Sequence, residues 1–235
     1  MRHFWFSACI AIFVLGCSFL KDSSVRGIPP QKKCLVLRIT TDLYLLDKAR
    51  RSDYSSELDE AVERMNEQEW YAYFAREVST YYLCPEGMYF EWLELIEKLG
   101  HLPPVAARAA VRAAWDFLLF HPLFQMNGDY TSILRRCSGG SDYGTVRSTF
   151  IRLVQIAERI SRKDAHDELG SLLISRKLTL AMIDTVLAAV STSNEDKNTD
   201  LYVWLKQCSS DQKLPALLRE EAKKALERCC LVTSK

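Results

Sequence analysis

Apolar side chains recur every three or four residues along most of this chain, and this periodicity restricts the fold more than any other feature of the sequence. The segment 70–81 shows it well, with one helical face made of Trp70, Tyr73, Phe74, Val78 and Tyr81. Comparable stripes follow in the segments 89–99, 105–120, 146–160, 178–190 and 218–229. The pattern predicts a series of amphipathic helices that pack their apolar faces together.

Glycine and proline are scarce, and several of them stand where a helix should begin or end. The chain has 9 Gly and 7 Pro among 235 residues, whereas strand-rich folds need frequent turns. Gly100 follows the stripe 89–99, where a C-terminal glycine cap belongs. Asp164 is placed to cap a helix that runs through Ser175. We therefore expect an all-α fold of about nine or ten helices, either a multi-helix bundle or a short α-solenoid of antiparallel helix pairs.

The first residues of the chain have the layout of an export signal. Arg2 precedes an apolar segment from Phe4 to Leu15, and the small residue Gly16 follows it. Such a segment partitions into the membrane while its positive end stays on the cytoplasmic side.

The tetrapeptide Val14-Leu15-Gly16-Cys17 resembles the lipobox of bacterial lipoproteins. This resemblance implies that residues 1–16 are a signal peptide that is removed and that Cys17 carries a diacylglyceryl lipid. Residues 17–33 would then be a tether, and 34–235 a helical domain held outside the cytoplasm in the bacterial cell envelope. Two alternatives remain open, namely ordinary cleavage after Ser18 and an uncleaved anchor over Phe4–Leu20.

Cysteine and histidine spacing gives no metal or redox motif. The exported part holds six cysteines besides Cys17, which could form disulfides of undetermined pairing: Cys34, Cys84, Cys137, Cys208, Cys229 and Cys230. No Cys-x-x-Cys pair occurs, and the histidines His101, His121 and His166 have no helical ligand spacing. We therefore expect no metal site.

Charge and motif content also exclude several functional classes. Lys and Arg number 31 against 30 Asp and Glu, with no dense basic run, so no nucleic-acid partner is expected. The loop from Gly139 to Thr145 lacks the lysine of a phosphate-binding loop, and no Gly-x-Ser-x-Gly motif occurs. We therefore expect no catalytic residues, no cofactor and no enzymatic activity.

Two groups of residues are candidates for binding a partner. Arg108 and Arg112 lie one turn apart in an otherwise apolar segment. They could line a basic groove for an acidic ligand. They could also be a solvated stripe, in which Asp116 lies at ion-pair spacing from Arg112. The aromatic residues Tyr71, Tyr82 and Phe90 fall off the apolar stripes. Exposed aromatic side chains are favoured at interfaces, although core packing would also account for this cluster.

These patterns lead to one expected function and one alternative. The expected function is a membrane-tethered envelope lipoprotein whose helical domain is a protein–protein interaction or assembly module for an unidentified envelope protein. The alternative is a helical ligand-binding lipoprotein that captures a small molecule in an aromatic-lined cavity beside Trp70 and Trp92 and passes it to a membrane partner.

Overall fold

The described part of the chain is helical throughout. The computed structural model describes residues 45–49, 56–81, 84–125, 142–175, 177–190 and 199–231, which belong to one compact unit within 45–235. These residues contain helices and no β-strand, which confirms the predicted all-α class for this part of the chain. None of the helices formed by these residues is both long and apolar enough to span a membrane.

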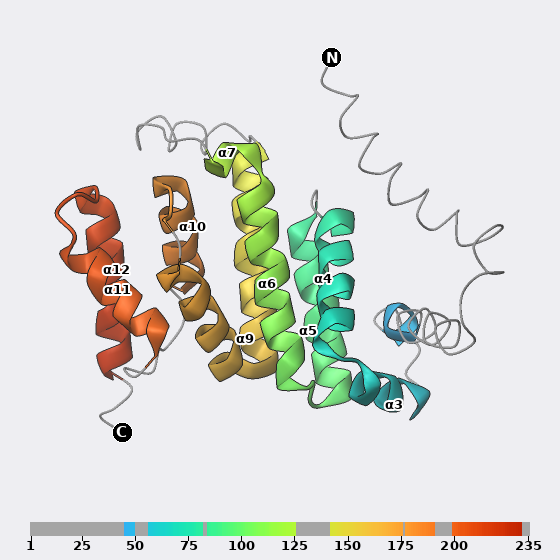
Figure 1. Cartoon of the computed structure of the whole chain (residues 1–235). Coiled ribbons are helices and arrows are strands. Elements are labelled where there is room, and N and C mark those ends of the chain that lie inside the picture. The colour runs from blue at the N-terminus through green and yellow to red at the C-terminus, as the bar shows by residue number, and fades with distance from the viewer. Residues whose placement is uncertain are drawn as a thin grey trace, which may run out of the picture. The chain divides into compact units, whose positions relative to one another are not determined.

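Besides the short helical segment 45–49, the described residues form the labelled helices of Figure 1, which follow in chain order: α3 (Ser56–Arg64), α4 (Glu67–Tyr81), α5 (Pro85–Leu99), α6 (Pro104–Phe120), α7 (Pro122–Gln125), α9 (Asp142–Ile174), α10 (Leu180–Val190), α11 (Asp200–Ser210) and α12 (Ala216–Leu231). Helices α6 and α9 pack along each other at the centre of this bundle. Helix α4 packs on α6, and α5 packs on α9. Helices α10 and α11 also contact α9, and α12 packs on α11 and α10.

Helix α6 is the central element because small residues cover most of its surface. Six alanines of this helix are buried together with Val111, Trp115 and Leu118. Small side chains let neighbouring helices approach closely, since the distance between packed helices depends on the side chains at the contact. The polar residues Arg108, Arg112 and Asp116 are four residues apart, so they share one face of the helix.

Helix α9 consists of two helical segments that meet at Ser161. This residue has φ −154° and ψ 104°, which interrupts the helical backbone. The sequence correctly predicted a break in this region, but it placed the cap at Asp164. The structure places the extended residue three positions earlier, and Asp164 lies in the first turn after it. Its Oδ2 accepts a hydrogen bond from Ser161 Oγ at 2.6 Å.

Local side-chain and backbone geometry accounts for the helix ends at several positions, and the predicted glycine cap at Gly100 is confirmed. Asn66 Oδ1 accepts from the backbone N–H of Glu69 at 3.1 Å, and Glu69 Oε2 accepts from the backbone N–H of Asn66 at 2.8 Å. This reciprocal pair is a capping box at the start of α4. Thr199 Oγ1 accepts from the backbone N–H of Tyr202 at the start of α11. Gly100 ends α5 with φ +71°, a backbone conformation that other residues rarely adopt.

Candidate functional site

The two arginines of α6 form an ion-pair network within the chain. Arg108 Nη1 donates to Asp164 Oδ1 at 2.6 Å, and Arg112 donates to Glu168 through Nε at 2.5 Å and through Nη2 at 3.1 Å. Glu67 of α4 pairs with Arg112 and lies 3.9 Å from Arg108. Three carboxylates thus face two guanidinium groups, so this surface carries no net positive charge. Arg108 and Arg112 therefore do not line an open basic groove.

The network aligns two pairs of helical turns. Arg108 and Arg112 are four residues apart on α6, and their partners Asp164 and Glu168 are four residues apart on α9. Each arginine is separated from its acidic partner by 56 residues in the chain. The pairing therefore holds the segment of α9 that follows Ser161 in register with α6. The same segment is held to the earlier part of α9 by His166 Nε2 and Glu158 Oε1, which are 2.8 Å apart.

Replacing Glu168 by Gln should destabilise the protein more than the same change at Glu67. The side chain of Glu168 is 10% exposed and binds Arg112 with both oxygens, whereas that of Glu67 is 33% exposed. Hydrogen bonds to charged groups contribute about 1.5–3 kcal/mol, and exposed pairs below about 1 kcal/mol. Because Arg112 is itself partly exposed, we expect a loss of about 1–2 kcal/mol for Glu168→Gln. Urea unfolding of both variants measures this, and an equal loss in the two would contradict it.

Tyr71 lies between α4 and α6 and is half-buried. Its hydroxyl donates to Asp116 Oδ2 at 2.7 Å, so Asp116 binds Tyr71, although its spacing suggested a pair with Arg112. Burial, this hydrogen bond and the negative charge of Asp116 raise the pKa of Tyr71 to about 12. The phenol of Tyr71 therefore serves as a link between two helices, and its polar end is not free for a partner.

Tyr71 makes a contribution to stability that should disappear at high pH. A tyrosine in an unfolded chain has a pKa of about 10, and folding raises the pKa of Tyr71 to about 12. Folding thus favours the protonated phenol, so its contribution is complete below about pH 10 and is lost as the pH rises through about 12. The difference in free energy of unfolding between the native protein and Tyr71→Phe should be constant at neutral pH and shrink above about pH 10. A difference that stays constant up to about pH 12 would contradict this assignment.

The remaining predicted binding residues have different outcomes. Phe90 on α5 is 62% exposed, as its position off the apolar stripe suggested. Tyr82 and the lipidation candidate Cys17 lie outside the described residues. Phe120, at the end of α6, is 77% exposed and was not singled out, because it belongs to the apolar segment 105–120.

The aromatic residues of the stripe 70–81, together with Trp92, form part of the packed core. Trp70, Tyr73, Phe74 and Trp92 are all completely buried. The rings of Phe74 and Trp92 have centroids 4.7 Å apart, and those of Tyr73 and Trp92 are 5.6 Å apart at an angle of 77°. These contacts fill the space between α4 and α5. The tryptophans beside which an aromatic-lined cavity was expected, Trp70 and Trp92, are therefore part of the packed core.

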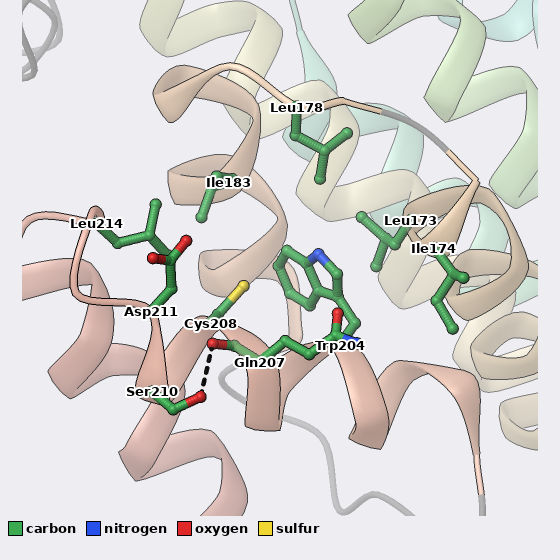
Figure 2. A pocket seen from close by; sticks show the side chains of 10 residues that line it. All are labelled: Leu173, Ile174, Leu178, Ile183, Trp204, Gln207, Cys208, Ser210, Asp211 and Leu214. Carbon is green, nitrogen blue, oxygen red and sulfur yellow. Dashed lines mark hydrogen bonds between the residues drawn. The ribbon is translucent and has the colours of Figure 1, made fainter.

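A cleft of about 480 Å³ opens at a different place, where the C-terminal end of α9 meets α10 and α11. Its apolar wall consists of Leu173, Ile174, Leu178, Ile183, Trp204, Cys208 and Leu214. Figure 2 shows the indole ring of Trp204 standing among these side chains. The polar lining residues Gln207, Ser210 and Asp211 lie together at the C-terminal end of α11. The arrangement suits an apolar molecule with one polar end.

Cys208 lies in the cleft as a neutral thiol. It is buried and free, and burial, together with the negative charge of Asp211, raises its pKa to about 12. A thiol reacts as a nucleophile or metal ligand only when it is deprotonated. Cys208 therefore contributes an apolar wall at neutral pH. Cys84 is also free, so neither of these two cysteines is in a disulfide.

The cleft depends on a close approach of α9 and α11 at Gly170. A Cβ atom at Gly170 would lie 2.5 Å from the backbone nitrogen of Leu201 and 2.8 Å from Cβ of Asp200. Only glycine allows the first turn of α11 to lie this close to α9. Trp204 follows one turn later and, because of this contact, faces Leu173 and Ile174 across the cleft.

Within the part of the chain that the structure describes, no group of three or more His, Cys, Asp or Glu side chains is arranged to hold a metal ion. Comparison of the chain with protein-family models, curated proteins and solved structures finds no match in any of the three.

Proposed function

We propose that this chain is a lipoprotein of the bacterial cell envelope, tethered to a membrane through Cys17, whose helical domain binds a small molecule with an apolar body. The observation that carries the ligand-binding part is the cleft between α9, α10 and α11. Its volume of about 480 Å³ falls within the range of about 300–1,000 Å³ of small-molecule sites. Seven of its ten lining residues are apolar, and the three polar ones lie together at the end of α11.

The ligand would lie in the cleft lined by residues of α9, α10 and α11, and not beside Trp70 and Trp92. Trp204 comes from α11, far along the chain from the aromatic-rich segment, and lines the cleft together with residues of α9 and α10. Trp92 is completely buried and Trp204 is only 5% exposed, so a ligand in the cleft would contact mainly the accessible apolar residues Ile174, Leu178 and Leu214. The alternative function that the sequence suggested is thus retained, with a different site.

Saturable binding of the uncharged dye Nile red tests the ligand-binding part. Leu214→Trp should fill the mouth of the cleft and weaken binding about tenfold or more, since about 1.4 kcal/mol corresponds to a factor of ten. Leu217→Trp is the matched control, because Leu217 is 51% exposed on α12 and does not line the cleft. Equal binding by all three proteins, or none by the native protein, would reject the cleft as a ligand site.

The tether is tested by replacing Cys17 with Ser in cells. The variant should lose incorporation of labelled lipid, because a hydroxyl does not replace the thiol in forming the thioether, and it should either leave the detergent phase or remain unprocessed. Cys9→Ser, within the apolar segment, is the matched control and should behave as the native protein. A Cys17→Ser variant that is processed and partitions as before would exclude this anchor.

A protein–protein interaction module remains a second candidate. Its specific support is two large aromatic side chains in solvent, Phe90 at 62% and Phe120 at 77% exposure. Aromatic residues are enriched at interfaces, where they bury a large area. If they bind an envelope protein, Phe90→Ala and Phe120→Ala should lose a crosslinked partner while the melting temperature stays unchanged.

A further inference from the structure

The lining of the cleft carries charge of only one sign. Among the ten described residues that line the cleft, Asp211 is the single charged side chain, and none of the ten is Lys, Arg or His. A ligand with a carboxylate or phosphate would therefore meet a like charge and no compensating cation. Burial of an uncompensated anion is costly, so the lining disfavours acidic ligands.

Asp211 is held in place by the turn that ends α11. Its backbone N–H donates to the carbonyl oxygen of Gln207 at 3.0 Å, and its Oδ1 accepts from the backbone N–H of Lys213 at 2.9 Å. One carboxylate oxygen thus fixes the turn, and the carboxylate stays at the edge of the cleft. The carbonyl end of α11 lies at the same place and adds partial negative charge.

The negative charge of Asp211 also reaches into the cleft. The charge contributes, after burial, to the raised pKa of Cys208, whose thiol lines the apolar wall. Figure 2 shows Asp211 and Leu214 on one side of the cleft and Leu173 and Ile174 on the other, with Trp204 and Cys208 between them. The cleft therefore has an apolar body and a negative end.

We propose that the ligand is a small cationic amphiphile, with its hydrocarbon or aromatic body against the accessible side chains of Ile174, Leu178 and Leu214 and its ammonium group paired with Asp211. This inference rests on the proposed ligand-binding function and adds the chemical class of the ligand. An ammonium group satisfies the carboxylate of Asp211, and the apolar body removes the accessible surfaces of Ile174, Leu178 and Leu214 from water.

Three probes of equal chain length separate charge from apolar contact: octylamine, octanol and octanoate. Each is titrated against the Nile red complex of the mature protein at low ionic strength. Octylamine should bind about three- to tenfold more tightly than octanol, a range that corresponds to one partly exposed charge-assisted pair, and octanoate should bind least. Added salt should reduce the preference for octylamine, because salt screens a pair at the edge of the cleft.

The variant Asp211→Asn should abolish the preference for octylamine. Asn keeps the side-chain oxygen that accepts from the backbone N–H of Lys213, so the turn can be retained. Asp200→Asn is the matched control, because it removes the same charge at the opposite end of α11 and does not line the cleft.

The outcomes distinguish this inference from the proposed function. Nile red binding that Leu214→Trp weakens, together with equal affinities for the three probes, would keep the ligand site and overturn the cationic class. A preference for octylamine that survives in Asp211→Asn, or tighter binding of octanoate, would overturn it as well. Absence of any Nile red binding would reject the ligand-binding function itself, and the cationic class with it.

Discussion

Trp92→Ala should lower the melting temperature by about 6–20 °C, the largest effect that we expect from any single substitution in this chain. Trp92 is completely buried and contacts the rings of Phe74 and Tyr73 at centroid distances of 4.7 and 5.6 Å. Truncation of a buried tryptophan to alanine costs about 3–5 kcal/mol, through lost apolar burial and the cavity that remains. In a domain of this size, each kcal/mol corresponds to about 2–4 °C.

Phe90→Ala is the matched control for this prediction. Phe90 lies two residues before Trp92 on the same helix and is 62% exposed, so its truncation should change stability by no more than about 0.5 kcal/mol. Thermal unfolding followed by far-ultraviolet circular dichroism compares the two. Similar losses in both variants would show that α5 does not pack as described.

Tyr71→Ala should fall between these two variants. The sequence suggested that Tyr71 is a surface residue whose loss leaves stability nearly unchanged. In the structure its hydroxyl donates to Asp116 at 2.7 Å and links α4 to α6. Loss of such a hydrogen bond from a half-buried group costs about 1 kcal/mol. The difference arises because helical spacing places Tyr71 at the edge of the buried stripe and does not reveal the acceptor on the neighbouring helix.

Helix positions and the aromatic core could be predicted because both depend on neighbours in sequence. The spacing of Trp70, Tyr73 and Phe74 assigns these residues to one face, and the structure buries that face completely. The capping box of Asn66 and Glu69 was likewise visible, since its two residues are three positions apart. Local patterns of this kind determine which face of a helix is apolar.

The contacts between helices could not be predicted in the same way. Arg108 and Arg112 find their acidic partners 56 residues later in the chain, and no local pattern identifies them. The cleft combines residues of α9, α10, α11 and the turn at Leu214, each of which reads as ordinary core or loop by itself. Periodicity shows that a residue faces the protein interior, but not which side chains from other helices surround it there.

Gly170→Ala should destabilise the protein, although the same change within an ordinary helix is stabilising by about 0.5–1 kcal/mol. The added methyl group would lie 2.5 Å from the backbone nitrogen of Leu201 and 2.9 Å from the carbonyl carbon of Asp200. Backbone atoms cannot rotate away as a flexible side chain can, so α9 and α11 must move apart. Overpacking of this kind costs about 1–3 kcal/mol, and we expect the melting temperature to fall by about 2–12 °C.

Separation of α9 from α11 should also weaken ligand binding, because the two helices supply opposite walls of the cleft. Gly100→Ala provides the matched control. At Gly100 an added Cβ meets no atom within 4 Å, but φ is +71°, so only the backbone is strained, at a cost of about 1–2 kcal/mol. Both variants should therefore lose stability, and only Gly170→Ala should also lose affinity for Nile red. A Gly170→Ala protein that is more stable than the native chain, or that binds Nile red equally well, would show that the close contact of these helices does not shape the cleft.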